Sequence, residues 1–514
     1  MGLERLLRRG ERDEFEISLV SRENYMVFQP MLPEVISGAI DMLHVISPIR
    51  RMAKRTHLHT REIERIDLAG KTVSLAPGFV PRQLTLPFDH LVLALGTTLD
   101  HAKVPGMQEH AIDFKYLGDA LRLRNHLVHV LEEADIETDP LERAKLLTFV
   151  VAGGGFSGVE CIAEMNDFLR SAVKAYRHVR PEELRVVLLQ SAERILPEMP
   201  ERLAAFAHRI LERRGVEIRL LTRLKCATAE AAIVQSKQTT EPELLPTRTI
   251  VATVPVTSHP ILRMLGVELR GGKLPVTSEL ELVDRAGVWA LGDCASIPLK
   301  DGTFAPPTAQ HALRQANVCA QNILATYRGA KRQSFAFGGL GKLASLGRQS
   351  AVAEVFGVKL SGLPAWLLWR AVYLSKFPGW ERKVRILADW LLHTFLPRDI
   401  TQVRIFAADP VSREHFEAGQ TLFNHQDFGD KVYFVVSGEA EVIRDGQLVA
   451  TVGPGGVIGE IALISDRPRS ATVRAKTSLD AVSVSRPAFR YLLEHVPGVR
   501  TTMESIMQRH LEKG

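Results

Sequence analysis

Three glycines, Gly153, Gly155 and Gly158, have the spacing that lets a pyrophosphate approach the peptide backbone. Apolar and β-branched residues at 147–151 precede them, and a proline-free segment at 159–169, compatible with a helix, follows. In a strand–turn–helix unit of this kind, the first glycine permits a tight turn, the second admits the ligand, and the third lets the helix pack closely. The helix N-terminus also offers N–H groups to the anion. The stretch therefore predicts a unit that binds a dinucleotide.

Two polar residues near this turn could contact a bound coenzyme. The predicted strand at 184–190 ends in Gln190, at the position where an acidic residue selects NADH through its ribose 2′-hydroxyl. Glutamine can donate to that hydroxyl without repelling a phosphate, so NADH is favoured and NADPH stays open. Glu160 follows the third glycine by two residues, near the expected nicotinamide. A glutamate in the first turn of a helix is also favoured by the helix dipole alone.

Two further turns have the residues that a flavin needs. A hydrophobic strand at 88–95 runs into Gly96, where small residues let a dinucleotide tail pass close to the backbone. A second short strand at 288–291 ends in Gly292 and Asp293, and an aspartate there can accept hydrogen bonds from ribityl hydroxyls. Taken alone, each is also compatible with an ordinary buried strand and turn. The helix that contains Gln310 could aim its N-terminal N–H groups at a flavin ring.

The beginning of the chain is unusual for a Rossmann unit. Residues 2–10 read as the second half of a helix, and a strand at 15–20 follows. Ser21 stands where an acid would hold an adenosine ribose, and Glu23 is a possible substitute two residues later. The strand and glycine turn that open such a unit should lie just upstream of Leu3. We interpret their absence as a start codon assigned too late rather than as degeneration.

Five motifs occur in an order that resembles the type II NADH:quinone oxidoreductases, which are single-subunit, non-proton-pumping flavoenzymes. They are FQPMLPEV at 28–35, ALGTT at 94–98, GGGFSGVE at 153–160, GDCA at 292–295 and AQHALRQ at 309–315. The resemblance covers roughly residues 12 to 405. It implies that Asp293 binds FAD, that the glycine turn with Glu160 binds NADH, and that Gln310 lies beside the quinone and the flavin ring.

Some residues depart from the pattern of this family. Arg314 stands where the family usually has a second glutamine, with Gln315 next to it, and Pro255 replaces a glycine of a small-residue turn. Related flavoproteins need other residues: disulfide reductases need a redox cysteine pair, and sulfide:quinone reductases need cysteines that carry sulfur. Cys161 and Cys319 do not suggest such a pair. The resemblance therefore implies hydride entering from NADH and electrons leaving to quinone.

The segment at 336–405 has a composition that suits a membrane surface. Four of the five tryptophans fall here, at Trp366, Trp369, Trp380 and Trp390, among leucines, lysines and arginines. Helices in which aromatic, aliphatic and basic residues alternate are typical of the plane of a lipid interface. The alternative is a buried helical hairpin of an ordinary soluble core. A lipid-soluble quinone as acceptor favours the membrane interpretation.

The last hundred residues change to short alternating strands and a second glycine-rich turn. There the sequence resembles the phosphate-binding cassette of cyclic nucleotide-binding β-rolls, at Gly459, Glu460, Arg469, Ser470 and Ala471. In that family the glutamate binds the ribose 2′-hydroxyl, the arginine pairs with the cyclic phosphate, and backbone N–H groups complete the anion site. The resemblance implies cAMP or cGMP as ligand, with cAMP preferred.

Bulk properties fit this organisation. The 514-residue chain has a formal net charge of +6, which suits an anionic surface or a nucleotide, but no Lys/Arg block is dense enough for nucleic acid. Its four cysteines form no C-x-x-C pair, which indicates a reducing compartment and no metal site. The chain has neither a signal peptide nor an apolar run of the roughly 18 residues that a span requires.

The sequence therefore predicts an α/β protein with two Rossmann-like units, the first truncated, then an amphipathic helical segment and a C-terminal β-roll. The expected domains are an FAD unit at 1–120 and 270–335, an NAD(P)H unit at 121–269, a membrane segment at 336–405 and a cyclic-nucleotide domain at 406–514. We expect an enzyme that transfers electrons from NADH to a quinone, without pumping protons and under cyclic-nucleotide control. It would lie on the cytoplasmic face of the inner membrane, where it could form a homodimer.

Two other functions stay open. One is a membrane-attached scaffold for the sensor whose reductase portion no longer binds FAD. The other is a soluble NADPH-dependent flavin reductase. Flavin content distinguishes the first from the enzyme, and liposome binding by residues 360–398 distinguishes the second.

Overall fold

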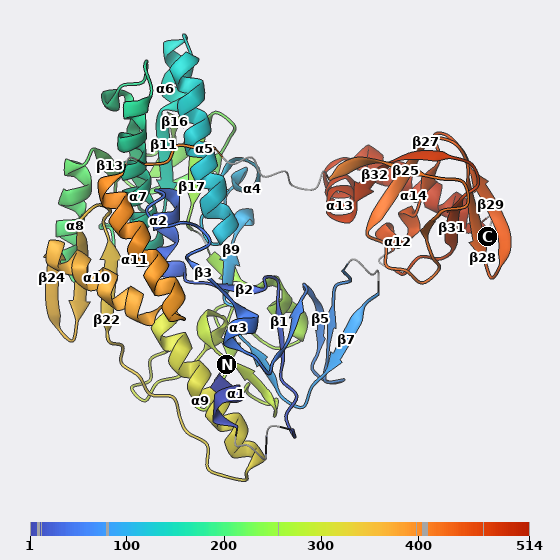
Figure 1. Cartoon of the computed structure of the whole chain (residues 1–514), viewed down its shortest axis with the longest axis horizontal. Coiled ribbons are helices and arrows are strands. Elements are labelled where there is room, and N and C mark those ends of the chain that lie inside the picture. Colours follow the sequence, from blue (N-terminus) through green and yellow to red (C-terminus); the bar gives the residue numbers. More distant parts are fainter. Residues whose placement is uncertain are drawn as a thin grey trace. The chain divides into compact units, whose positions relative to one another are not determined.

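The computed structural model describes residues 2–7, 11, 13–78, 82–254, 256–396, 398–402, 410–465 and 467–512, and Pro255 lies outside them. The chain forms two compact units, one of residues 1–60 with 89–404 and the other of residues 61–88 with 405–514. Both helices and sheets are present throughout (Figure 1). The predicted α/β class with a β-rich C-terminal part is confirmed.

A parallel five-stranded sheet forms the centre of the larger unit, in the order β10-β17-β11-β12-β13. The strands are β10 (Ile112–Asp113), β17 (Thr249–Ala252), β11 (Thr148–Ala152), β12 (Arg185–Leu189) and β13 (Val216–Arg219). Both faces of β11 are buried, because Phe149 and Val151 join one apolar core while Val150 and Ala152 join another. This explains why the strand reads as a continuous apolar run.

Helices and a small second sheet cover the two faces. The helices around this sheet are α2 (Leu32–Ile36), α5 (Leu117–Ile136), α6 (Pro140–Leu146), α7 (Phe156–Ala172) and α8 (Glu201–Arg213). The antiparallel sheet is β14 (Thr222–Ala227), β15 (Ala231–Ser236) and β16 (Glu243–Pro246). Helix α7 starts at Phe156, within the glycine motif, three residues earlier than the sequence predicted. Strand β11 has β12 on one side and β17 on the other, so the turn that follows it lies at a topological switch point.

Short strand pairs make up the remaining α/β part of this unit. They are β1 (Ser18–Ser21) with β4 (His57–Thr60), β2 (Tyr25–Val27) with β3 (Ile46–Pro48), β8 (Leu91–Leu93) with β20 (Val288–Ala290), β9 (Thr97–Leu99) with β18 (Val256–Ser258), and β19 (Leu274–Pro275) with β21 (Ala295–Ser296). Because β8 and β20 are parallel, the turns that follow them lie at the same end. Three shorter helices and the long α9 complete it: α1 (Gly2–Leu6), α3 (Ile49–Met52), α4 (Met107–His110) and α9 (Ala309–Tyr327).

The last part of the larger unit is an antiparallel sheet followed by two helices. The strands are β22 (Gly341–Ser345), β23 (Ala351–Val355) and β24 (Val358–Gly362), and the helices are α10 (Leu363–Lys376) and α11 (Trp380–Phe395). The helices were predicted, whereas the sheet was not. It packs against α7, α8 and α10, so β23 is buried by tertiary contacts that no local pattern reveals. Within the described residues, no helix has both the length and the apolar character needed to span a bilayer.

The smaller unit consists of β-sheets and short helices. Residues 61–88 contain β5 (Ile63–Asp67), β6 (Thr72–Leu75) and β7 (Leu84–Pro87). The C-terminal β-roll has two four-stranded sheets, β25-β32-β27-β30 and β26-β31-β28-β29. Its elements are β25 (Val411–Phe416), β26 (Thr421–Phe423), β27 (Lys431–Ser437), β28 (Ala440–Arg444), β29 (Gln447–Val452), β30 (Val457–Ile458), α12 (Glu460–Ile464), β31 (Thr472–Ala475), β32 (Leu479–Ser485), α13 (Arg486–His495) and α14 (Pro497–Glu512).

Candidate dinucleotide and cyclic-nucleotide sites

The glycine turn after β11 has two positions that exclude a side chain and one that leaves open space. A Cβ at Gly153, whose φ is +117°, would lie 2.4 Å from Thr253 Oγ1, and one at Gly158 would lie 1.7 Å from the Gly153 oxygen. Gly155 is the N-cap of α7, and a Cβ there would meet nothing within 4 Å. The turn is therefore closed at its first and third glycines and open at the second, where a ligand would approach the backbone.

Gln190 supports this turn from the end of β12. The Gly154 N–H donates to its Oε1 at 3.3 Å, and its Nε2 donates to the Arg194 oxygen at 3.0 Å. The side chain is buried. Gln190 thus lies next to the predicted coenzyme site, but both ends of its amide already hold the local backbone.

Glu160 points into the protein interior. Its Oε1 accepts a 2.8 Å hydrogen bond from the Ser345 N–H of β22. This bond connects α7 to the β22–β24 sheet. Burial raises the pKa of Glu160 to about 8, against the lowering effect of the Ser345 hydrogen bond. The carboxyl group is therefore mostly protonated at neutral pH, which the sequence did not predict.

A buried polar cluster lies within electrostatic reach of this glutamate, because Glu34 is among the groups that raise its pKa. Trp390 Nε1 of α11 donates to Glu34 Oε2 of α2 at 2.9 Å, and an Arg370 nitrogen of α10 lies 3.6 Å from Glu34 Oε1. The Arg370 guanidinium carbon lies 3.8 Å from the Trp366 ring centroid and 4.4 Å from that of Trp390. Burial, and then Glu164, raises the pKa of Glu34. The cluster joins α2 to α10 and α11.

The two turns expected to hold a flavin lie at the ends of adjacent parallel strands. A Cβ on Gly96 (φ +64°) would meet nothing within 4 Å, and Gly292 has φ +71°. Gln315 Oε1, which is buried, accepts a 2.8 Å hydrogen bond from the Gly292 N–H, so it fixes the turn that carries Asp293. Gln315, which stands next to the position where the family usually has its second glutamine, therefore helps to hold the Gly292 turn in place.

Lys115 is a residue of this region that the sequence did not single out. Its ammonium donates to the Thr97 carbonyl oxygen and, at 2.8 Å, to Thr97 Oγ1. Burial lowers the pKa of Lys115, and nearby Asp293 opposes that effect. Lys115 therefore places a positive charge between the two turns. An isolated lysine after a short strand carries no sequence signal for this position.

The remaining predicted residues of the reductase part lie in different surroundings. Glu23 follows β1 and is exposed. The pKa of Tyr25 is raised first by the burial of its own hydroxyl group and second by the negative charge of Glu23. Gln310 Nε2 donates to the Gly341 oxygen at 3.1 Å, while its Oε1 accepts from the Leu340 N–H at 3.0 Å. Its amide thus fastens the start of α9 to the start of β22.

Arg314, which replaces the family's second glutamine, packs beside Gln310. Its guanidinium lies 3.9 Å from the Phe337 ring centroid, and it donates to the Gln310 carbonyl oxygen at 2.9 Å. Cationic stacking on an aromatic face is a contact that glutamine cannot make. Arg314 therefore places a positive charge, held by these two contacts, on the surface of α9 where the family usually has a neutral glutamine.

The β-roll brings Arg469 and Glu460 into a buried site. Arg469 is 1% exposed, donates to the Gly459 and Lys431 carbonyl oxygens at 2.8 and 2.7 Å, and stacks 4.0 Å from the Phe423 ring centroid. Among the described residues its Nε has no hydrogen-bond partner. Burial lowers the pKa of Arg469, which stays charged because an arginine pKa is far above neutrality.

The residues around Arg469 complete the predicted cassette. Glu460 is 2% exposed at the start of α12. Gly459 has φ +87°, and a Cβ there would lie 2.2 Å from an Arg469 nitrogen, so glycine is required. Ser470 and the buried Ala471 follow directly, before β31. The cassette thus combines a buried cation with an orphan N–H donor, which is a site for an anion.

The cysteines are buried or half-buried free thiols. Burial raises the pKa of Cys161 and raises that of Cys319 to about 12, so both remain protonated thiols at neutral pH. In the parts of the chain that the structure describes, no group of three or more His, Cys, Asp or Glu side chains could hold a metal ion.

Comparison with protein families identifies three regions. Residues 3–316 match the pyridine nucleotide-disulphide oxidoreductases, residues 340–399 match the NDH2 C-terminal domain, and residues 413–496 match the cyclic nucleotide-binding domain.

Similar proteins with curated descriptions include a type II NADH:quinone oxidoreductase of Mycobacterium tuberculosis. It is 30% identical over 419 residues, which cover 79% of this chain and 89% of that protein. A demethylphylloquinone reductase of Synechocystis is 29% identical over 73% of this chain and 88% of its own length.

Solved structures support the same fold. The NDH2 of Plasmodium falciparum in complex with NADH superposes with a TM-score of 0.72 at 18% identity, over 76% of this chain and 95% of that one. A sulfide:quinone oxidoreductase of Aquifex aeolicus gives a TM-score of 0.59 at 16% identity, over 78% and 92%.

Proposed function

Because the chain belongs to the pyridine nucleotide-disulphide oxidoreductases, and within them to the type II NADH:quinone oxidoreductases with an added cyclic nucleotide-binding domain, we propose that it uses FAD to transfer electrons from NADH to a membrane quinone. We further propose that a cyclic nucleotide regulates this transfer. The assignment of residues 1–120 with 270–335 to FAD, 121–269 to NADH, 336–405 to the membrane and 406–514 to the sensor is part of the proposal.

The glycine turn at 153–158 is the observation that carries NADH binding. Its second glycine leaves the backbone open at the N-terminus of α7, where helix N–H groups can receive a pyrophosphate. The turn lies beside β17 at a switch point, which is where open parallel sheets bind dinucleotides. Gln190 would keep the turn in this shape. NADH is favoured over NADPH because a glutamine at this position can donate to the ribose 2′-hydroxyl.

The residues at the ends of β8 and β20 fit the ribityl end of FAD. Asp293 offers acceptors to hydroxyl groups, Gly96 leaves its backbone approachable, and Lys115 supplies a cation between them. Glu23 would bind the adenosine ribose. When bound, FAD would supply the ability to accept a hydride and return electrons in pairs. The protein would contribute binding, orientation and electrostatics.

The quinone would approach near Gln310, at the junction of α9 and β22. Helices α10 and α11 carry exposed apolar side chains that suit a lipid surface: Leu363, Leu367, Trp380, Val384, Leu387, Leu391, Leu392 and Phe395. Peripheral binding of these helices to the cytoplasmic face of the inner membrane would bring a lipid-soluble acceptor to the enzyme. Glu160 would serve as a buried proton-holding group between the nucleotide helix and this region.

A cyclic nucleotide would bind the cassette of the β-roll. The orphan Nε of Arg469 supports a phosphate there, because a buried guanidinium nitrogen without a partner is costly. Glu460 would accept from the ribose 2′-hydroxyl. Ser470 leaves cAMP and cGMP both acceptable, with cAMP preferred. Regulation requires that the ligand bind two states of the enzyme with different affinity.

The enzyme proposal is tested with the full chain and the variant Gly155→Val. We expect visible flavin absorption in both proteins, NADH:quinone reductase activity in the unaltered chain, and loss of NADH binding in the variant because its side chain fills the open position. The enzyme proposal would be overturned, and the scaffold favoured, if neither this chain nor one extended upstream to the preceding in-frame start held flavin while both bound cAMP. Flavin-dependent NADPH oxidation without liposome binding would favour the soluble reductase.

Regulation is tested by titrating cAMP and cGMP into the quinone-reductase assay. We expect the rate to change with half-effect near the dissociation constant measured by calorimetry, and Arg469→Gln to lose both the binding and the rate change. Arg413→Gln, at an exposed arginine on β25 of the same β-roll, serves as the control. An unchanged rate at demonstrated saturation would remove the regulatory proposal and leave the enzyme proposal intact.

A further inference from the structure

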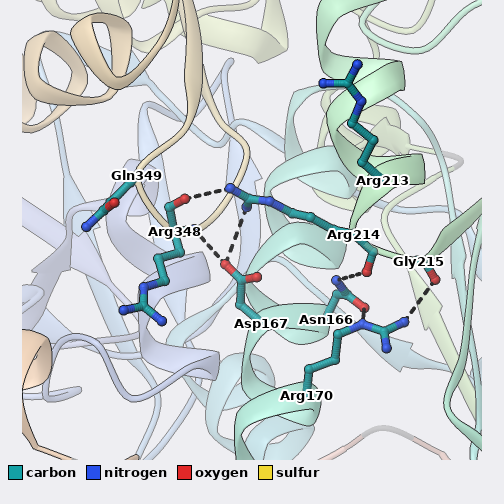
Figure 2. Close-up of a pocket in the computed structure, with 8 residues that line it drawn as sticks. All are labelled: Asn166, Asp167, Arg170, Arg213, Arg214, Gly215, Arg348 and Gln349. Carbon is teal, nitrogen blue, oxygen red and sulfur yellow. Dashed lines mark hydrogen bonds and ion pairs between the residues drawn. The ribbon is translucent and has the colours of Figure 1, made fainter. Parts of the chain in front are cut away.

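A cavity of about 520 Å³ on the larger unit is lined by four arginines and one carboxylate (Figure 2). The arginines are Arg170, Arg213, Arg214 and Arg348, and the carboxylate is Asp167. They come from α7, the end of α8 and the turn between β22 and β23. None of these residues belongs to the dinucleotide sites described above.

Two of the arginines are used by the protein itself. Arg214 donates to the Leu346 and Arg348 carbonyl oxygens at 2.5 and 2.6 Å, which pins the β22–β23 turn against α8. Arg170 donates to Asn166 Oδ1 at 3.0 Å and to the Gly215 oxygen at 3.1 Å. These two side chains therefore have a structural role that needs no ligand.

The single carboxylate of the cavity is also used internally. The Arg348 N–H donates to Asp167 Oδ2 at 2.6 Å, and an Arg214 nitrogen lies 3.6 Å from the same oxygen. A Cβ on Gly347 would lie 2.3 Å from this oxygen, so the turn depends on glycine there. Asp167 therefore supports the backbone of the turn and neutralises part of one arginine.

In the part of the chain that the structure describes, two guanidinium groups of the cavity have no protein partner. Neither the Arg213 nor the Arg348 side chain makes a hydrogen bond or ion pair within the described residues, and Figure 2 draws no contact to either guanidinium. Both side chains are exposed. With four arginines and one aspartate, the cavity has a formal charge of +3. Like charges gathered in one hollow repel one another, and an anion would remove that repulsion.

We propose that this cavity binds a phosphate group, which Arg213 and Arg348 would reach from opposite elements by a change of rotamer, since Figure 2 shows these two exposed side chains extending away from each other. A guanidinium presents paired N–H donors, and a tetrahedral phosphate has enough oxygens to accept from two such forks at once, whereas a carboxylate has two. The pinned turn holds the Arg348 backbone in place before any ligand arrives. The volume exceeds that of a lone phosphate ion, so the cavity also has room for a larger headgroup or ester that carries the phosphate.

The surroundings of Arg348 connect the cavity with the end of α11. Burial, followed by Arg398, Arg370 and Arg348, lowers the pKa of His393 to about 4, so Arg348 lies within electrostatic reach of this helix. The same last turns expose Leu391, Leu392 and Phe395. A phosphate-binding cavity next to exposed apolar side chains fits the headgroup of an anionic phospholipid. A soluble phosphate compound is the other ligand that could supply the same group.

The test uses the full-length holoprotein and the double variant Arg213→Ala/Arg348→Ala. Neither side chain has a hydrogen bond or ion pair to any residue that the structure describes, so their loss should leave folding intact, which the flavin spectrum and thermal melting check. Arg209→Ala is the matched control, because Arg209 is an exposed arginine of the same helix that does not line the cavity. The probes are inorganic phosphate, measured by calorimetry, and vesicles of phosphatidylcholine with or without phosphatidylglycerol, measured by co-sedimentation.

We expect the double variant to bind at least one probe about tenfold more weakly than the unaltered protein and the control, since charge-assisted contacts are lost. Weaker binding only to phosphatidylglycerol vesicles identifies a lipid headgroup, and weaker binding to inorganic phosphate identifies a soluble ligand. Equal binding of both probes by all three proteins overturns the proposal. These readouts do not involve quinone reduction, so they can fail while the proposed function stands.

Discussion

Replacing Glu160 with glutamine should make the larger unit less sensitive to alkaline pH. Glutamine resembles the protonated carboxyl in shape and keeps an oxygen that can accept from the Ser345 N–H. It has no proton to lose in the working range. The variant therefore isolates the free energy that the unaltered protein loses when this buried carboxyl ionises.

The sign and size of the effect come from proton linkage. Burial raises the pKa of Glu160 from 4.5 to about 8, so the folded protein holds a proton that the unfolded chain has released. The contribution of this carboxyl group to the unfolding free energy has its full value below pH 4.5, and it is lost as the pH rises towards 8. Between pH 6 and pH 8, the loss from one such group is about 2 kcal/mol.

Tryptophan fluorescence during urea unfolding measures this loss. All five tryptophans lie at positions 289–390, in the larger unit, so the signal does not include the β-roll. The unfolding free energy of the unaltered protein should fall by about 2 kcal/mol relative to Glu160→Gln between pH 6 and pH 8. Glu198→Gln, at an exposed glutamate, should run parallel to the unaltered protein.

Parallel curves for the unaltered protein and Glu160→Gln would refute the reasoning. They would mean that the buried carboxyl keeps an ordinary pKa or is ionised in the folded state. A variant that is less stable by a constant amount at every pH would indicate a lost hydrogen bond and no linked proton.

Three other changes are expected to have measurable effects. Lys115→Met should lower the flavin content of the purified protein several-fold, measured by visible absorption, and unchanged content would assign Lys115 a structural role. Trp390→Phe leaves a buried Glu34 oxygen without its donor and should lower the unfolding free energy by about 1–3 kcal/mol, measured by circular dichroism in urea. Gly459→Ala pushes a Cβ into the Arg469 guanidinium at a positive φ, so calorimetry should detect weaker cAMP binding while the basal reductase rate stays the same.

The nucleotide unit could be predicted from sequence because its signals are local. An apolar strand, a spaced glycine turn and a proline-free helix occur consecutively, and the structure has β11, the turn and α7 in that order. The β-roll was predictable for the same reason, since its cassette is one continuous stretch. In both cases the residues that determine the backbone are neighbours in the chain.

The partners of the polar side chains could not be predicted in this way. Gln310 hydrogen-bonds to the backbone of residues 340–341, and Glu160 accepts a hydrogen bond from the Ser345 N–H. Both contacts exist because the β22–β24 sheet packs against the larger unit's helices, including α7. Those contacts depend on residues far apart in sequence, in a sheet that the composition of 336–405 concealed. Lys115 was missed because only the fold brings it beside the Gly96 turn.

Gln190 has a consequence for how coenzyme preference can change in this protein. Its amide shapes the glycine turn at one end and the loop of Arg194 at the other, at the position from which ribose recognition is expected. A substitution that alters the choice of coenzyme therefore also releases two backbone groups from their partners. Shifts between NADH and NADPH are expected to evolve through paired substitutions, in which a second residue restores the loop before the new preference becomes useful.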